Sequence, residues 1–165
     1  MALMLLRFLA VMVTAIAMAA GFAHLLELPN KMALSRAEYL VVQQIYRGWA
    51  FLGVVVLGAL VASGIVALQV HARSAQFYLT LAVTACIALS LLLFFIFTTP
   101  ANQETQNWTI LRDNRESLRW QWEYSHAAGA GLYFLALSAL TPFSAPRPAR
   151  TESWIMARCR LEGRS

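Results

Sequence analysis

The chain has 165 residues, of which 59% are hydrophobic and only 13% are charged, and its net charge is +5 at pH 7. A small soluble domain is mostly surface and could not cover this much apolar side chain, while disorder needs low hydrophobicity and high charge. The chain has only two cysteines and no metal-binding spacing, which excludes a disulfide scaffold and a structural zinc site. The composition therefore predicts a membrane protein. Its positive net charge favours binding to a lipid surface over binding to nucleic acid.

Four segments are long and apolar enough to cross a bilayer, which takes about 20 helical residues. They lie at about residues 5–27, 48–70, 76–98 and 124–142. Together they predict a single domain over residues 1–143, folded as an all-α, antiparallel four-helix bundle in the membrane with polar and aromatic outer loops. The first segment would also suit a signal peptide, but the polar residues at its end favour a retained helix.

Prolines and capping residues predict where the helices end. Pro29 disfavours helical geometry in the residue before it and predicts the end of the first helix near residue 28. Ser35 and Glu38 fit a capping box, which predicts a helix that begins at Arg36 and continues into the second span. Pro100 predicts the end of the third span.

Four spans place both termini on the same side of the membrane. That side carries seven basic residues and two acidic ones, against six of each on the other side. The positive-inside tendency therefore predicts cytoplasmic termini, with loops 28–47 and 98–125 outside. With 12 arginines and one lysine the composition is typical of a bacterial inner-membrane protein. Residues 144–165 are expected to form a flexible basic tail, either solvated or lying on anionic lipid.

Two pairs of ionisable residues stand at the ends of predicted spans. His24 and Glu27 leave the first span, and Glu123 and His126 enter the fourth. A separation of three residues places each pair on one face of its helix. The predicted topology then brings both pairs to the outer end of the bundle. Ionisable groups at membrane depth are costly, which makes these four the candidate catalytic residues.

Three interpretations fit this cluster. The side chains of His24, Glu27, Glu123 and His126 could bind a single iron, copper or zinc ion, because imidazole and carboxylate suit these metals. They could instead work without a cofactor, each carboxylate orienting an imidazole that acts as a general acid or base. In the third interpretation the pairs are purely structural and satisfy one another where helices meet.

Polar and aromatic residues in the outer loops supply candidate substrate-binding groups. An aromatic-walled pocket with a few polar groups is the usual form of a small-molecule site. Tryptophan often marks the membrane interface without further function, but an interface does not require amides. An arginine here could pair with Glu27 or Glu123, or bind an anionic group of the substrate. The residues expected to line the pocket are Tyr46, Asn102, Trp108, Arg119 and Trp122.

Three blocks of sequence resemble the anthrone-oxygenase-like family of small four-span membrane proteins. Residues 21–31 (GFAHLLELPNK) resemble the signature of its first helix. Residues 42–49 (VQQIYRGW) resemble its second block. Asn102 and residues 118–126 (LRWQWEYSH) resemble the block before its last helix. The resemblance covers roughly residues 5–140 and rests on the order and spacing of these motifs.

The resemblance implies a small oxidoreductase or oxygenase that acts on anthrones or similar hydrophobic aromatic molecules without a conventional cofactor. His24 and His126 would be the bases, and the deprotonated substrate would react with dioxygen directly. Asn102, Trp108, Arg119 and Trp122 would shape the pocket.

A non-catalytic function is the alternative. The chain would then be an accessory or ligand-binding subunit that forms a homo-oligomer or joins another membrane protein. Its small size and the absence of a complete catalytic motif favour this interpretation. Three glycines in the second span, which predict close helix packing, also favour it: Gly53, Gly58 and Gly64.

Overall fold

The computed structural model describes residues 1–110 and 112–141, so the predicted tail at 144–165 lies outside the described residues. Every regular element within the described ranges is helical, which confirms the all-α class. In chain order these elements are α1 (Ala2–Ala33), α2 (Arg36–Gln43), the 3-10 turns η1 (Gln44–Tyr46) and η2 (Trp49–Phe51), α3 (Leu52–Gln69), α4 (Ser74–Leu93), the π-helical turn η3 (Phe94–Thr98), α5 (Thr99–Glu104) and α6 (Arg115–Leu140).

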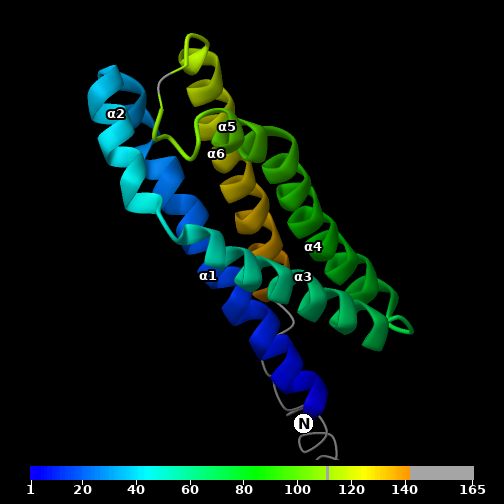
Figure 1. Ribbon diagram of the computed structural model, residues 1–165. Helices are drawn as coiled ribbons and strands as arrows, with labels where there is room; N and C mark the ends of the chain where they lie inside the picture. The colour runs from blue at the N-terminus through cyan, green and yellow to red at the C-terminus, as the bar shows by residue number, and fades with distance from the viewer. Residues whose placement is uncertain (111, 142–165) are drawn as a thin grey trace, which may run out of the picture.

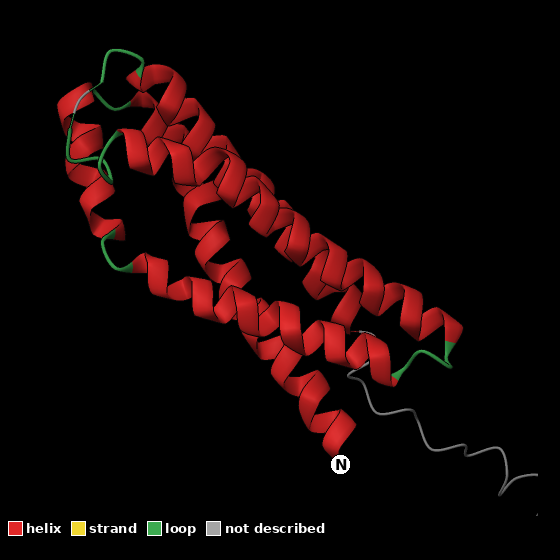
Figure 2. Cartoon of the chain, turned by 45° about the vertical axis from the view of Figure 1, so that its right-hand side comes forward, coloured by secondary structure: helices red, strands yellow, loops and turns green. Residues whose placement is uncertain are grey.

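Each of the four long helices in the described ranges packs against two of the others. Helix α1 contacts α3 and α6, and α4 contacts the same two helices. Figure 1 shows α2 and α5 together at one end of the molecule, with the N-terminus at the opposite end. Figure 2 shows the loops on either side of α2 at this same end, which we call the α2 end. The main core lies between the long helices and includes Ala17, Ala59, Val83, Ile87 and Tyr133.

Three stretches of helix are long and apolar enough to cross a membrane, namely Ala2–Ala33, Trp49–Gln69 and Ser74–Glu104. Their outward surfaces carry large apolar side chains such as Phe51 and Phe95, which are 82% and 62% exposed. An exposed apolar surface of this extent is consistent with contact with membrane lipid. Helix α6 is also long, with 26 residues or about 39 Å, but its first turns carry several charges.

Two prolines predicted to end helices do not end them. Helix α1 continues through Pro29 to Ala33, because a proline removes a single backbone donor and helices in a packed membrane protein tolerate that loss. The third span likewise continues past Pro100. The π-helical turn η3 comes first and joins α4 to α5 without a break, and Pro100 lies near the start of α5.

The capping box at Ser35 is confirmed, with the reciprocal bonds between Ser35 and Glu38 both present and α2 beginning at Arg36. The predicted continuation of this helix into the second span is wrong. Helix α2 ends at Gln43, and the chain turns at Gly48, whose φ of 90° is a left-handed value that favours glycine. This turn separates α2 from α3, so that α2 contacts α6 through Tyr39 and Glu123 instead of extending the second span.

The glycines of the second span predict close helix packing at their own positions, and this prediction is wrong. A methyl group built on Gly53, Gly58 or Gly64 would have no neighbouring atom within 4 Å. At Gly21 of α1, by contrast, the added carbon would lie 3.2 Å from the Cα of Ala130 in α6. The close approach therefore joins α1 to α6, the two helices that carry the candidate histidines.

Candidate functional site

The two predicted pairs do lie at the same end of the molecule, the α2 end. Helix α1 supplies His24 and Glu27, and α6 supplies Glu123 and His126. The imidazoles and the carboxylates, however, belong to two adjoining groups with different partners.

The first group is a histidine pair enclosed by aromatic rings. The ring centroids of His24 and His126 are 4.3 Å apart. His24 also contacts Tyr46 at 4.5 Å, Trp122 at 5.1 Å and Trp49 at 5.4 Å between centroids. His126 packs on Trp122 at 4.0 Å. Elements far apart in the sequence thus enclose two imidazoles in an aromatic box.

The hydrogen bonding of the two imidazoles is unequal. The Nδ1 atom of His126 is 2.9 Å from the backbone oxygen of Trp122 and donates to it, which leaves Nε2 as the acceptor of the neutral ring. His24 is buried, and its Nδ1 has no hydrogen-bond partner among the described residues. Buried polar atoms nearly always have partners, so this nitrogen is an unsatisfied polar atom inside the protein.

The second group is centred on Lys31, which the sequence analysis did not select. Its Nζ lies 2.9 Å from Glu123 Oε2 and 3.7 Å from Glu27 Oε2. It also donates to the Tyr46 hydroxyl at 3.2 Å, and that hydroxyl donates to Glu27. Lys31 and Glu123 are only 3% and 0% exposed, whereas the Glu27 side chain is 41% exposed. Lys31 therefore occupies the space between the two predicted carboxylates.

The other oxygen of Glu123 is bound from α2. Tyr39 donates its hydroxyl to Glu123 Oε1 at 2.9 Å, and Gln43 Nε2 lies 3.4 Å from the same oxygen. Gln43 also donates to the Tyr39 hydroxyl. Burial, and then the nearby Glu123 carboxylate, raise the pKa of Tyr39 far above its usual value, so the phenol stays protonated as a donor. Tyr39 and Gln43 were also missed from the sequence.

The predicted four-ligand metal site is not formed in this arrangement. Within residues 1–110 and 112–141, no group of three or more His, Cys, Asp or Glu side chains is placed to hold a metal ion. Lys31 engages both carboxylates, while the imidazoles contact aromatic rings. The two groups meet at the rings of Tyr46 and Trp122, since the Lys31 ammonium lies 4.9 Å from each ring centroid.

Asn102 positions two of the predicted pocket walls. Its Oδ1 accepts hydrogen bonds from the indole nitrogens of Trp122 at 2.9 Å and Trp108 at 3.2 Å. Trp108 ends a run of three residues with left-handed φ values of 49°, 55° and 62°, which begins at Gln106. Such backbone is costly for residues other than glycine and persists where surrounding contacts impose it. The burial of Trp108 and its bond to Asn102 are those contacts.

Arg119 borders the second group, on the far side of the Tyr39 ring. It is 5% exposed, its guanidinium is 4.3 Å from the centroid of the Tyr39 ring, and its Nη1 donates to the backbone oxygen of Leu34 at 3.1 Å. Of the two roles considered for Arg119, the ion pair with Glu27 or Glu123 is not formed, since its one acidic partner within 4 Å in the described part of the chain is Glu116, at 3.9 Å. The other role, binding an anionic group, stays a prediction.

An apolar groove lies on the outer surface of α4 and α6. It has a volume of about 550 Å³ and is open and almost entirely apolar. The lining residues are Leu89, Leu93, Ala128, Gly131, Leu132, Phe134 and Leu135.

No protein-family model, curated protein or solved structure matches this chain. The proposals below therefore rest on the residues and their geometry.

Proposed function

We propose that this protein is an integral membrane oxidoreductase or oxygenase that acts on a hydrophobic aromatic small molecule, with His24 and His126 at the reacting position. The observation that carries the proposal is the buried imidazole of His24, whose free Nδ1 lies among aromatic rings beside a second imidazole. A structural histidine would normally have its ring nitrogens satisfied. A planar phenol or polycyclic ketone would stack on the aromatic walls and hydrogen-bond to Nδ1 of His24.

The bundle that would present this site has α6 as its fourth membrane span. Helix α6 contacts both α1 and α4, and its outer surface exposes Phe134 and Leu135. Four spans would place both termini on one side, which we assign to the cytoplasm of a bacterium on the basis of the positive-inside tendency. The α2 end and the histidine pair would then face outward.

The reaction that fits this site is oxygenation of an activated ring CH2 group. A neutral imidazole removes one proton, and the resulting carbanion gives its electrons to dioxygen and forms a C–O bond. The hydroperoxide then loses water, so that CH2 and O2 become C=O and H2O. The substrate supplies all four electrons, and no further reductant is needed. His24 would be the base, and His126, held through its Nδ1, would receive or return a proton at Nε2.

Access would be lateral, through the lipid. Hydrophobic aromatic molecules partition into the bilayer, and the groove between α4 and α6 opens toward that phase. The π-helical turn η3 lies beside this route, with Phe94 contacting His126 at 6.3 Å between centroids. Such turns are frequent at functional sites.

The test is oxygen consumption by the purified protein in maltoside micelles with anthrone as the probe, followed by product analysis. A positioned acid or base contributes about 10²–10⁴-fold to rate, so His24→Ala should lose activity by that order. His71→Ala is the matched control, because His71 is exposed and outside the box. Folded His24→Ala and His126→Ala proteins that retain wild-type activity would overturn the proposal.

A non-catalytic ligand-binding or accessory subunit is the second candidate. The network of Lys31, Glu123 and Tyr39 favours it, because it joins α1, α2 and α6 without needing a substrate. Mass measurement of the solubilised protein distinguishes the two. A homo-oligomer or a stable membrane complex without turnover would support the accessory function, and an active monomer would exclude it.

A further inference from the structure

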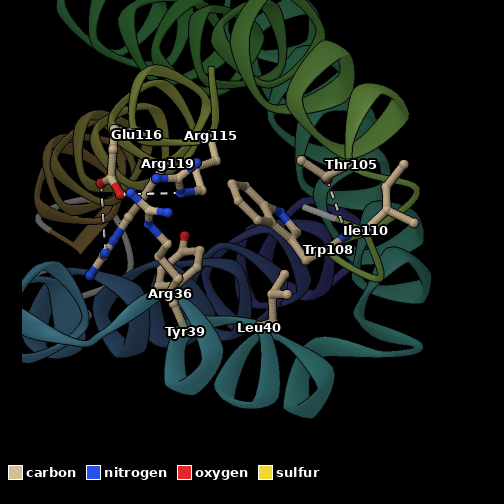
Figure 3. Close-up of a pocket in the computed structure, with 9 residues that line it drawn as sticks. All are labelled: Arg36, Tyr39, Leu40, Thr105, Trp108, Ile110, Arg115, Glu116 and Arg119. Atoms are coloured by element: carbon tan, nitrogen blue, oxygen red, sulfur yellow. Dashed lines mark hydrogen bonds and ion pairs between the residues drawn. The ribbon is translucent and has the colours of Figure 1, made fainter. Parts of the chain in front are cut away.

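A small pocket lies at the α2 end, between α2, the start of α6 and the loop that follows α5. Its volume is about 20 Å³, which is room for about one water-sized group. Figure 3 shows three guanidinium groups gathered on one side of it near Glu116, with Trp108 on the other side. Neither histidine lines it. The lining residues are Arg36, Tyr39, Leu40, Thr105, Trp108, Ile110, Arg115, Glu116 and Arg119.

The deepest cation of this pocket is incompletely bonded. Arg119 is 5% exposed, yet its Nε and Nη2 are buried without a hydrogen-bond partner. These two nitrogens form one edge of the planar guanidinium, the edge that matches two oxygens of a carboxylate or phosphate. The remaining nitrogen, Nη1, is fixed by the Leu34 oxygen, and the plane rests on Tyr39. The free edge is thus held in place before any ligand arrives.

The charges around the mouth of the pocket are not balanced. Arg36, Arg115 and Arg119 face a single carboxylate, that of Glu116. Glu116 is 59% exposed and lies 3.7 Å from Arg115 Nε and 3.9 Å from Arg119 Nη1. These contacts are too long for hydrogen bonds and do not reach the free edge of Arg119. The side chain of Arg36 has no hydrogen bond or ion pair in the described part of the chain. Three cations against one anion leave an excess of two positive charges.

We propose that this pocket binds a phosphate group, with one oxygen inserted toward Arg119 and the others between Arg36 and Arg115. The excess of two charges suits a phosphate better than a carboxylate. The phosphate could belong to a free phosphorylated molecule or to the headgroup of an anionic phospholipid, because the pocket lies where the apolar helices end. The proposal does not depend on the oxygenase reaction.

The experiment uses the full chain in maltoside micelles, which contain no phosphate. One arm titrates inorganic phosphate and the other adds phosphatidic acid to the micelles, each against chloride at equal ionic strength. Tryptophan fluorescence reports binding, because Trp108 lines the pocket. A response to inorganic phosphate alone identifies a free ligand, and a response to phosphatidic acid alone identifies a headgroup. Either response supports the site if the variants below abolish it.

The variants distinguish binding in this pocket from binding to basic residues elsewhere on the surface. Arg119→Lys keeps the charge and removes the two-nitrogen edge, and should weaken binding about tenfold or more. Arg36→Ala removes an exposed mouth cation that makes no hydrogen bond or ion pair in the described part of the chain, and should weaken binding severalfold. Arg47→Ala is the matched control, since Arg47 is an exposed arginine outside the pocket. No binding in either arm would overturn the proposal. Equal binding by wild type and all three variants would show an adventitious ion only and would overturn it as well.

Discussion

The ion pair between Lys31 and Glu123 is the contact whose loss we expect to cost most. Both side chains are almost fully buried, and the 2.9 Å separation of Lys31 Nζ and Glu123 Oε2 is that of a close ion pair. Removing one partner of a buried pair typically costs about 3–5 kcal/mol, because the other charge is left without compensation. Glu123 has no other ion pair in the described chain, whereas Lys31 keeps Glu27 at 3.7 Å. Lys31→Met should therefore lie at the upper end of this range, and Glu123→Gln should cost less.

A double-mutant cycle tests this asymmetry. The free energy of unfolding is measured in mixed micelles by titration with a denaturing detergent, for each single variant and for both together. The double variant leaves neither charge unpaired and should be more stable than the sum of the single effects predicts, by about 1 kcal/mol or more. Glu116→Gln removes an exposed carboxylate and should change stability by less than about 0.5 kcal/mol. Additive effects, or a larger loss in Glu123→Gln than in Lys31→Met, would refute the reasoning.

Three further predictions concern packing, pH and metal. Gly21→Ala should cost about 1–3 kcal/mol because the new carbon would crowd Ala130, whereas Gly58→Ala, with no neighbour within 4 Å, should be neutral or mildly stabilising in the same unfolding assay. Hydrogen bonds to Ser35 hold the pKa of Glu38 below its usual 4.5. The ionised capping box therefore stabilises the folded protein above that pH and loses this effect as the pH falls. Glu38→Gln should be less stable than wild type at neutral pH and equal to it in acid. Elemental analysis should find less than one equivalent of iron, copper or zinc, since Lys31 engages both carboxylates; one equivalent, lost when both imidazoles are removed, would contradict this.

Sequence patterns were sufficient for the features that depend on local spacing. The helical class follows from long apolar runs, and the start of α2 follows from the side chains of Ser35 and Glu38. The meeting of the two predicted pairs at one end follows from the alternating direction of successive helices. Each of these is set by residues close in sequence or by simple topology.

Lys31 shows why the rest could not be predicted. It stands seven residues after His24 and four after Glu27, which is the spacing of one helical face. This signal is lost if the helix is taken to end at Pro29. In the structure α1 continues past Pro29, and its last turn carries Lys31, which pairs with Glu123 on α6. The free edge of Arg119 is likewise invisible in the sequence, since it depends on where Leu34 and Tyr39 lie.

Asn102 has an optical consequence. Because one amide oxygen accepts from both Trp108 and Trp122, the two indoles are held at fixed mutual orientation, with centroids 6.3 Å apart and planes at 82°. Chromophores this close and this rigid couple their strong indole transitions and are expected to produce a pair of bands of opposite sign in the far-ultraviolet circular dichroism spectrum. The loop after α5 and helix α6 therefore carry an intrinsic spectroscopic marker that should vanish when this end of the protein opens, well before the long helices themselves unfold.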